Sequence, residues 1–160
     1  MSSSLAQRDL YHIGIVVDDF DAACEDYARS LGLTWSPVIE VGMDVWLAGQ
    51  GIKHLDFKAV YSVEAPHIEI VQAIPGTPSV PVPGRPMHHL GYWSDDLAAD
   101  SQRLEALGNP RIMCPLAEGK PVGFVFHALP DGTLIELVDR GAFADWQAFL
   151  ENREVFKSAV

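Results

Sequence analysis

Positive charge is scarce in this 160-residue chain, which has 11 Lys and Arg residues against 22 Asp and Glu residues and a formal net charge of −11. Proteins that bind nucleic acids or anionic membranes through phosphate groups need a basic face, so the composition argues against both partners. The two cysteines, Cys24 and Cys114, are too few for a disulfide framework. No apolar run approaches the roughly 20 residues of a membrane span, and the first residues lack the apolar core of a secretory signal. We therefore expect a cytoplasmic protein.

Apolar residues, by contrast, are present in ordinary amount, at 48% of the chain. That fraction is typical of a globular protein and too high for a disordered one. A chain of this length can bury a core that is stable without disulfides or structural metals. We therefore interpret residues 1–160 as a single domain.

Two parts of the chain resemble each other in sequence. Residues 11–23, YHIGIVVDDFDAA, align with residues 88–99, HHLGYWSDDLAA, and the IEIV of residues 68–71 aligns with the IELV of residues 135–138. The two matches occur in the same order, which predicts two related halves. The identical positions in the first match are His12 and His89, Gly14 and Gly91, Asp18 and Asp95, and Asp19 and Asp96.

Each half has the pattern of a β-α-β-β-β unit, with strands marked by β-branched residues and helices by an apolar stripe at helical spacing. The first module is expected over residues 9–73, with strands at 12–17, 34–41, 55–63 and 67–72 and a helix at 20–31. The second is expected over residues 87–140, with strands at 89–94, 111–115, 124–128 and 133–139 and a helix at 97–107. A proline-rich linker, residues 74–86, separates the modules, and a helix is expected at residues 142–157.

Four potential metal ligands share one face of these strands. Because side chains alternate along a strand, His12, Glu69, His89 and Glu136 all project from the face away from the helices. A glutamate on a strand usually lies on a solvated face. Here, however, each half places one His and one Glu on equivalent faces, and imidazole nitrogen with carboxylate oxygen suits Zn, Mn, Fe, Co or Ni. The pattern therefore predicts a site for one divalent metal ion.

The segments HIGIVVDDFDAA, HIEIV, HHLGYWSDDLAA and LIELV resemble those of the vicinal oxygen chelate superfamily of glyoxalases, bleomycin resistance proteins and dioxygenases. The resemblance implies an α+β fold, in which two βαβββ modules form one cup-shaped, barrel-like mixed sheet with helices on the outside. It also implies metal ligation by His12, Glu69, His89 and Glu136, a ligand pattern that is similar to the glyoxalase I and methylmalonyl-CoA epimerase branches. His89, rather than His88, aligns with His12, so His88 is expected to point to the helix side.

For such a metal centre the implied chemistry is removal of a proton from a carbon next to a carbonyl, with the metal stabilising the enediolate charge. A carboxylate of raised pKa moves the proton; Glu136 is preferred as the base, with Glu69 equally placed by symmetry. This makes the chain a divalent-metal-dependent lyase, isomerase or epimerase. Two alternatives stay open: an Fe(II) ring-cleaving dioxygenase, and a metal-free protein that sequesters a drug or other ligand, as bleomycin resistance proteins do.

The substrate is expected to be a small molecule of apolar or aromatic character, because several aromatic residues fall on the predicted strands. The four cationic residues Lys53, Lys58, Arg85 and Lys120 are scattered, so neither a phosphate nor a glutathione ligand can be assigned. The family often pairs modules between chains, so the resemblance implies a homodimer. The aromatic candidates for the pocket are Trp46, Phe57, Trp93, Phe124 and Phe126.

Overall fold

The computed structural model describes residues 5–152. The first half contains β1 (Leu10–Val17), α1 (Phe20–Leu31), β2 (Ile39–Leu47), β3 (Gly51–Tyr61) and β4 (His67–Gln72). The second half contains β5 (His89–Ser94), α2 (Leu97–Ala106), β6 (Arg111–Cys114), β9 (Phe124–Ala128) and β10 (Leu134–Asp139). The shorter elements are η1 (Gln7–Asp9), β7 (Leu116–Ala117), β8 (Lys120–Pro121), η2 (Arg140–Ala142) and α3 (Trp146–Leu150).

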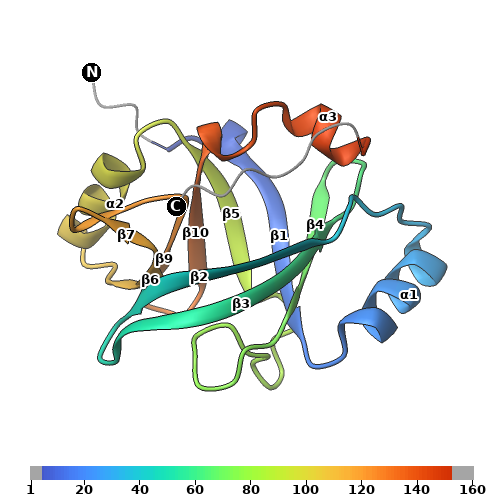
Figure 1. Ribbon diagram of the computed structural model, residues 1–160, viewed down its shortest axis with the longest axis horizontal. Helices are drawn as coiled ribbons and strands as arrows, with labels where there is room; N and C mark the ends of the chain where they lie inside the picture. The colour runs from blue at the N-terminus through green and yellow to red at the C-terminus, as the bar shows by residue number, and fades with distance from the viewer. Residues whose placement is uncertain (1–4, 153–160) are drawn as a thin grey trace.

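The long strands close into one barrel in the order β1-β4-β3-β2-β6-β9-β10-β5, with the helices outside it (Figure 1). In each half the first strand pairs in parallel with the last, β1 with β4 and β5 with β10. The halves meet along two antiparallel seams, β1 with β5 and β2 with β6. The predicted α+β class and barrel-like sheet are therefore confirmed.

The second strand of the first half differs from the prediction. The expected strand at residues 34–41 is wrong, because β2 begins only at Ile39 and continues to Leu47. Before it, Trp35 makes an isolated bridge to Ser62. Pro37 has no backbone N–H to donate to a ladder, which explains why pairing starts after it. The later part of β2 was missed because it contains Gly42 and Asp44, two residue types that are rare in strands, although its exposed and covered residues alternate as in a strand.

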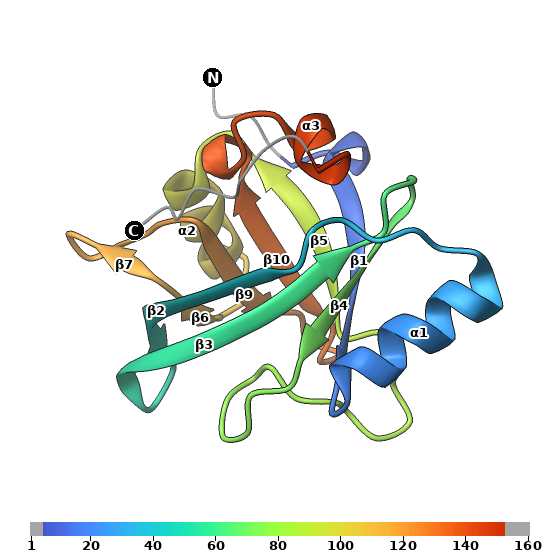
Figure 2. The same ribbon diagram turned by 45° about the vertical axis from the view of Figure 1, so that its right-hand side comes forward.

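The two helices have matching N-termini but contact the barrel to different extents. Asp19 accepts a hydrogen bond from the Ala22 backbone N–H, and Asp96 accepts one from the Ala99 N–H, so each acidic residue caps its helix. Helix α1 lies to one side of the barrel beside β4, whereas α2 packs over β6, β9 and β10 (Figure 2). Only Phe20 of α1 is buried.

The C-terminal segment covers one end of the barrel. The predicted helix over residues 142–157 starts too early: η2 comes first, and α3 begins at Trp146, where Asp145 accepts a hydrogen bond from the Ala148 N–H. Residues 153–157 of that prediction lie outside the described residues. Phe149 and Leu150 pack in a hydrophobic cluster with Tyr61 of β3 and other barrel residues. Among residues 5–152, no helix has both the length and the apolar character needed to cross a membrane.

Candidate metal centre

Four neighbouring strands, β4, β1, β5 and β10, bring the predicted ligands together. The backbone register forms two rows across these strands. One row runs Glu69, Gly14 and His89, and the other runs His12, Gly91 and Glu136. Each row therefore holds one Glu and one His on either side of a glycine, and each row draws its two ligands from different halves of the chain.

The glycines of the two rows are required by the imidazole rings that lie over them. A Cβ atom at Gly14 would come within 1.9 Å of the His89 ring, and a Cβ atom at Gly91 would come within 1.9 Å of the His12 ring. Neither ring could keep its place beside any residue larger than glycine. The repeated His-x-Gly pattern was visible in the sequence, but its reason is this reciprocal packing across the β1–β5 seam.

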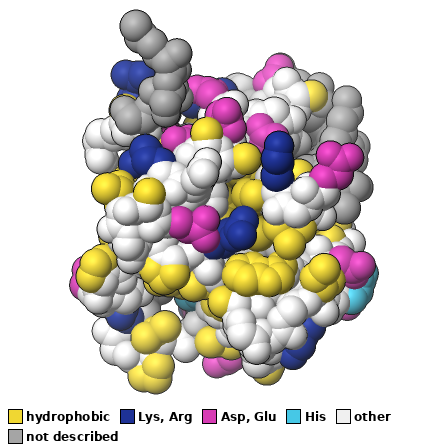
Figure 3. All heavy atoms as spheres, turned by 90° about the vertical axis from the view of Figure 1, so that its left-hand side faces the viewer, with side chains coloured by type: hydrophobic (Ala, Val, Ile, Leu, Met, Phe, Trp, Pro, Cys, Tyr) yellow, Lys and Arg dark blue, Asp and Glu magenta, His cyan; other side chains and the backbone are white. Residues whose placement is uncertain are grey.

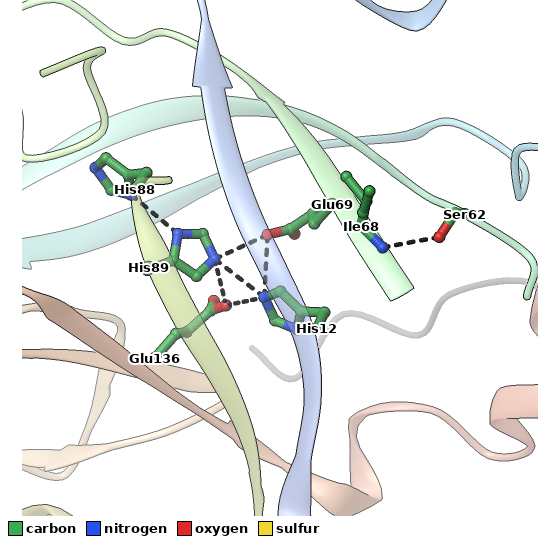
Figure 4. Close-up of polar contacts among 7 residues, drawn as sticks. All are labelled: His12, Ser62, Ile68, Glu69, His88, His89 and Glu136. Carbon is green, nitrogen blue, oxygen red and sulfur yellow. Dashed lines mark hydrogen bonds and ion pairs between the residues drawn. The ribbon is translucent and has the colours of Figure 1, made fainter. Parts of the chain in front are cut away.

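The four side chains converge on a common point (Figure 4). The two Nε2 atoms of His12 and His89 are 3.0 Å apart. Glu69 Oε2 lies 3.2 Å from His12 Nε2 and 3.0 Å from His89 Nε2. Glu136 Oε2 lies 3.0 Å and 3.2 Å from the same two atoms. Adjacent donors bound at about 2.1 Å to one metal ion lie about 3 Å apart, so these separations suit a single divalent cation.

Burial and charge set the protonation of this cluster. Burial favours the neutral form of Glu69, but the His12 and His89 imidazoles outweigh it and hold the pKa of this carboxyl well below its usual range. Burial and the charge of Glu69 both act to raise the pKa of Glu136, yet its contacts with the same imidazoles lower it overall. Burial opposes the charged form of His89, but Glu136 and Glu69 raise its pKa to about 9. The imidazoles therefore favour the ionised form of both carboxyls, and a base of raised pKa among them stays a prediction.

The donor set also leaves an atom that a cation would satisfy. Within residues 5–152, Glu136 Oε2 is buried with no hydrogen bond of good geometry. Two ionised carboxylates in one buried site need compensating positive charge, which either protonated imidazoles or a metal ion can supply. The residues present therefore fit a divalent metal, and the cluster could hold one, although that role stays a prediction.

An apolar pocket opens onto the cluster, with about 850 Å³ of empty space that includes its open mouth. Glu69, His89 and Glu136 line this pocket, whereas His12 lies behind them and does not. A molecule in the pocket would thus meet the face that carries both carboxylates. Most of the other lining residues are apolar: Ile39, Val41, Met43, Phe57, Ala59, Val71, Met113, Phe124, Phe126, Val138 and Phe143.

Three of the five predicted aromatic candidates, Phe57, Phe124 and Phe126, line the pocket. The other two do not. Trp93 stacks on Tyr11, with ring centroids 3.7 Å apart, and Trp46 packs near α2 beneath Arg111. Trp46 alternates with the pocket-lining residues Val41 and Met43 and so lies on the outer face of β2. Trp93 lies on the same strand face as His89 but fills the core, a difference that strand alternation does not reveal.

Two residues near the cluster were not recognised from the sequence. Tyr61 of β3 stands in register with Glu69 and lines the pocket, and burial together with the charge of Glu69 raises the pKa of its hydroxyl well above the ordinary value. His88 lies against His89 and against the linker at Pro78, so the prediction that it points to the helices is wrong. It precedes β5, where strand alternation no longer sets the direction of a side chain.

Comparison with protein families gives one match over most of the barrel. A family model described as the glyoxalase/bleomycin resistance protein/dioxygenase superfamily matches residues 11–126. No curated protein sequence matches the chain.

Solved structures with the same fold include a hypothetical protein, BH1468, from Bacillus halodurans C-125. It is 20% identical, with a TM-score of 0.57 over 85% of this chain and 96% of that one. Methylmalonyl-CoA epimerase from Mycobacterium tuberculosis is 25% identical, with a TM-score of 0.50 over 87% and 91% of the two chains. A methylmalonyl-CoA epimerase in complex with methylmalonyl-CoA and NH4+ is 20% identical, with a TM-score of 0.54 over 87% and 97%.

Proposed function

The chain belongs to the glyoxalase/bleomycin resistance protein/dioxygenase superfamily, and from that premise we propose that it is a divalent-metal-dependent lyase, isomerase or epimerase. Its reaction would begin with removal of a proton from a carbon next to a carbonyl group. The observation that carries the proposal is the convergence of two imidazoles and two carboxylates where an apolar pocket meets the barrel wall. Epimerases with the same fold support it.

The metal would be held by His12, Glu69, His89 and Glu136. When bound, a divalent ion such as Zn, Mn, Co, Ni or Fe supplies a Lewis acid beside the substrate's carbonyl oxygen, which makes the neighbouring C–H more acidic. The protein contributes a fixed donor arrangement, because the four side chains are at most 10% exposed and come from paired strands. Such preorganised charge is effective because little has to move during the reaction.

The two carboxylates would move the proton. Both line the pocket, both are ionised, and they come from opposite halves of the barrel, so a substrate carbon between them could lose a proton on one side and regain it on the other. We assign the primary base to Glu136, because its Oε2 is the carboxylate oxygen of the cluster without a well-formed hydrogen bond among residues 5–152. Glu69 is the matching acid or base.

The pocket favours an apolar or aromatic substrate. None of the Lys and Arg side chains in the described part of the chain lines it. On the face drawn in Figure 3, cationic side chains are dispersed among acidic and hydrophobic ones rather than gathered into a phosphate-binding patch. The portion of the substrate that enters the pocket would therefore be uncharged, which favours a compact apolar ketone or aldehyde derivative over a substrate with several phosphate groups. We also expect the homodimer implied by the family.

The first test is metal content. Protein purified without added metal is expected to carry close to one equivalent of a divalent metal by mass spectrometry, and His12→Ala and His89→Ala should each lose it. His54→Ala is the matched control, because His54 is an exposed imidazole on β3 that pairs with Asp44 and Asp56 and not with the four predicted ligands. Metal-free wild-type protein that binds aromatic ligands tightly would overturn the proposal and favour sequestration.

The second test is proton exchange. In D2O, a panel of alkyl- and aryl-substituted 2-hydroxy ketones is followed by proton NMR for loss of the signal next to the carbonyl. At least one member should exchange with the metal-loaded wild type and far more slowly with Glu136→Gln. Oxygen consumption with Fe(II) and a catechol, without exchange of any ketone, would contradict the proposal in favour of the dioxygenase alternative.

A further inference from the structure

His88 is an imidazole outside the four ligands that lies directly against one of them. Its Nδ1 atom is 2.9 Å from Nδ1 of His89, and its Nε2 atom is 2.7 Å from the carbonyl oxygen of Pro78 (Figure 4 shows the first contact). Both imidazoles are buried, at 6% and 1% exposed. We propose that His88 is a positioning residue that fixes the ring orientation and the proton of His89. The proposal rests on the metal-binding function above.

The hydrogen-bond partners of His88 determine which ring nitrogens of His88 and His89 carry a proton. A carbonyl oxygen only accepts, so Nε2 of His88 carries a proton and donates it to Pro78. With that proton in place, neutral His88 offers Nδ1 as an acceptor, and the 2.9 Å contact then needs a donor at Nδ1 of His89. The proton of His89 is thereby held on the side away from the cluster. Nε2, which faces His12, Glu69 and Glu136, is then the ring nitrogen that gives up its proton when a metal binds, while Nδ1 keeps its own.

The linker between the two halves gives this arrangement its rigidity. Thr77 Oγ1 donates to the Ile74 carbonyl oxygen at 2.7 Å and accepts from the Ser79 N–H at 3.0 Å. The Ile74 N–H in turn donates to the Ser79 carbonyl oxygen at 2.8 Å. The turn formed by residues 74–79 is thus closed on both sides of Pro78, so the Pro78 carbonyl is held at a defined position. The linker thus holds the Pro78 carbonyl, which orients His88, and His88 in turn orients the predicted metal ligand His89.

Among residues 5–73, the first half has no equivalent of this support. The residue aligned with His88 is Tyr11, whose ring meets the His12 ring edge-on at 4.4 Å between centroids. His12 Nδ1 has no hydrogen-bond partner among residues 5–152. The orientation of His12 therefore depends on packing, whereas that of His89 depends on a directed hydrogen bond. We therefore infer that the ring of His89 is held in its orientation more specifically than that of His12.

The direct test is NMR of protein with nitrogen-15 in its histidines, in the metal-free and the Zn(II)-loaded states. The expected result in both is a proton bonded to Nδ1 of His89, with a scalar coupling across the hydrogen bond to Nδ1 of His88. A proton bonded to Nδ1 of His88, or no coupling between the two rings, would overturn the proposal. Because the metal-free measurement stands alone, failure to bind Zn(II) would count against the proposed function without deciding the role of His88.

The second test is Zn(II) affinity by competition with a chromophoric chelator. His88→Phe should weaken binding by about 10- to 100-fold, as loss of an outer-shell partner of a ligating His does. His88→Gln, whose amide oxygen can accept from His89, should recover part of that loss. The matched control is His127→Phe, which removes a buried imidazole that also donates to a backbone carbonyl, that of Asn109, but touches no ligand. Equal Zn(II) affinities for the two Phe variants would contradict the proposal.

Discussion

The two halves of the barrel have the same strand order but differ in how their helices support it. Helix α1 buries only Phe20, and Leu31 at its end is 59% exposed. Helix α2 buries Leu97 and Leu104 and also two polar residues. The metal-ligand geometry depends on the strands and on the two glycines between them, which both halves share. The site therefore depends on the strands, which are alike in the two halves, and not on the helices, which differ in how much they bury.

Beneath α2 lies a buried polar network without an equivalent under α1 in residues 5–152. Ser101 Oγ is 2.9 Å from His127 Nε2, and His127 Nδ1 donates to the Asn109 carbonyl oxygen at 2.9 Å. Because that carbonyl can only accept, Ser101 is the donor in the first contact. Both side chains are at most 1% exposed, and neither lines the apolar pocket, so the network ties α2 to β9 rather than forming a second site.

The largest effect on the metal site should come from changing the shared glycines. Gly14→Ala and Gly91→Ala each place a methyl group inside an imidazole ring, so each should abolish stoichiometric metal binding and lower the free energy of unfolding by about 1–3 kcal/mol. Metal content and urea unfolding measure the two effects. Gly141→Ala is the control, because the nearest atom to its Cβ would be Asp139 Oδ1 at 3.3 Å, well beyond the 1.9 Å contacts at Gly14 and Gly91. If just one of the two variants lost metal, the halves would not be equivalent at the site.

The unequal support by the helices should appear as unequal costs of truncating a leucine in each. Leu104→Ala removes a side chain that is 7% exposed and packed in the α2 cluster, so the free energy of unfolding should fall by about 2–5 kcal/mol. Leu31→Ala, at an exposed position of α1, should change it by less than about 0.5 kcal/mol. Chemical unfolding of both variants tests this, and similar costs would refute the difference between the helices.

Acid should weaken the α2 side through His127. Burial lowers the pKa of His127 below its ordinary value, with Glu105 and Arg111 acting in opposite directions nearby. Below the ordinary pKa of about 6.5 the unfolded chain therefore binds more protons, and stability falls as the pH falls, by at most about 1.4 kcal/mol per pH unit. Unfolding between about pH 5 and about pH 7.5 should show a shallower dependence for His127→Gln than for the wild type. Identical slopes would show that His127 does not titrate on unfolding.

The smallest expected effects are at the helix caps, where the halves should behave alike. Asp19→Ala and Asp96→Ala each remove one side-chain hydrogen bond of 3.0 Å to the first turn of a helix. Each should cost about 1 kcal/mol of unfolding free energy. Thermal unfolding of the two variants compares them directly. A clearly larger cost at Asp96 would mean that the cap energy depends on how firmly the helix is packed.

Much of the fold was predictable because the repeat and the strand alternation agree. His12 and His89 each stand two residues before a glycine in a β-branched or aromatic run, and Glu69 and Glu136 each follow an isoleucine in one. The barrel-like shape of the sheet was predicted from the family resemblance. The chain segment at residues 42–47 was missed because Gly42 and Asp44 have a low strand preference, which the pairing of β2 with β3 outweighs.

The sequence by itself determined which side chains share a face, because the two-residue period of a strand is a local property of the backbone. It also determined the helix starts, since an aspartate N-cap acts on its own first turn. Only the tertiary structure decided that four donors meet within 4.8 Å of one another, that Gly14 and Gly91 make room for the rings, and that His88 contacts His89. These features depend on the register between strands distant in the chain and on the path of the linker, which are set when the whole barrel closes.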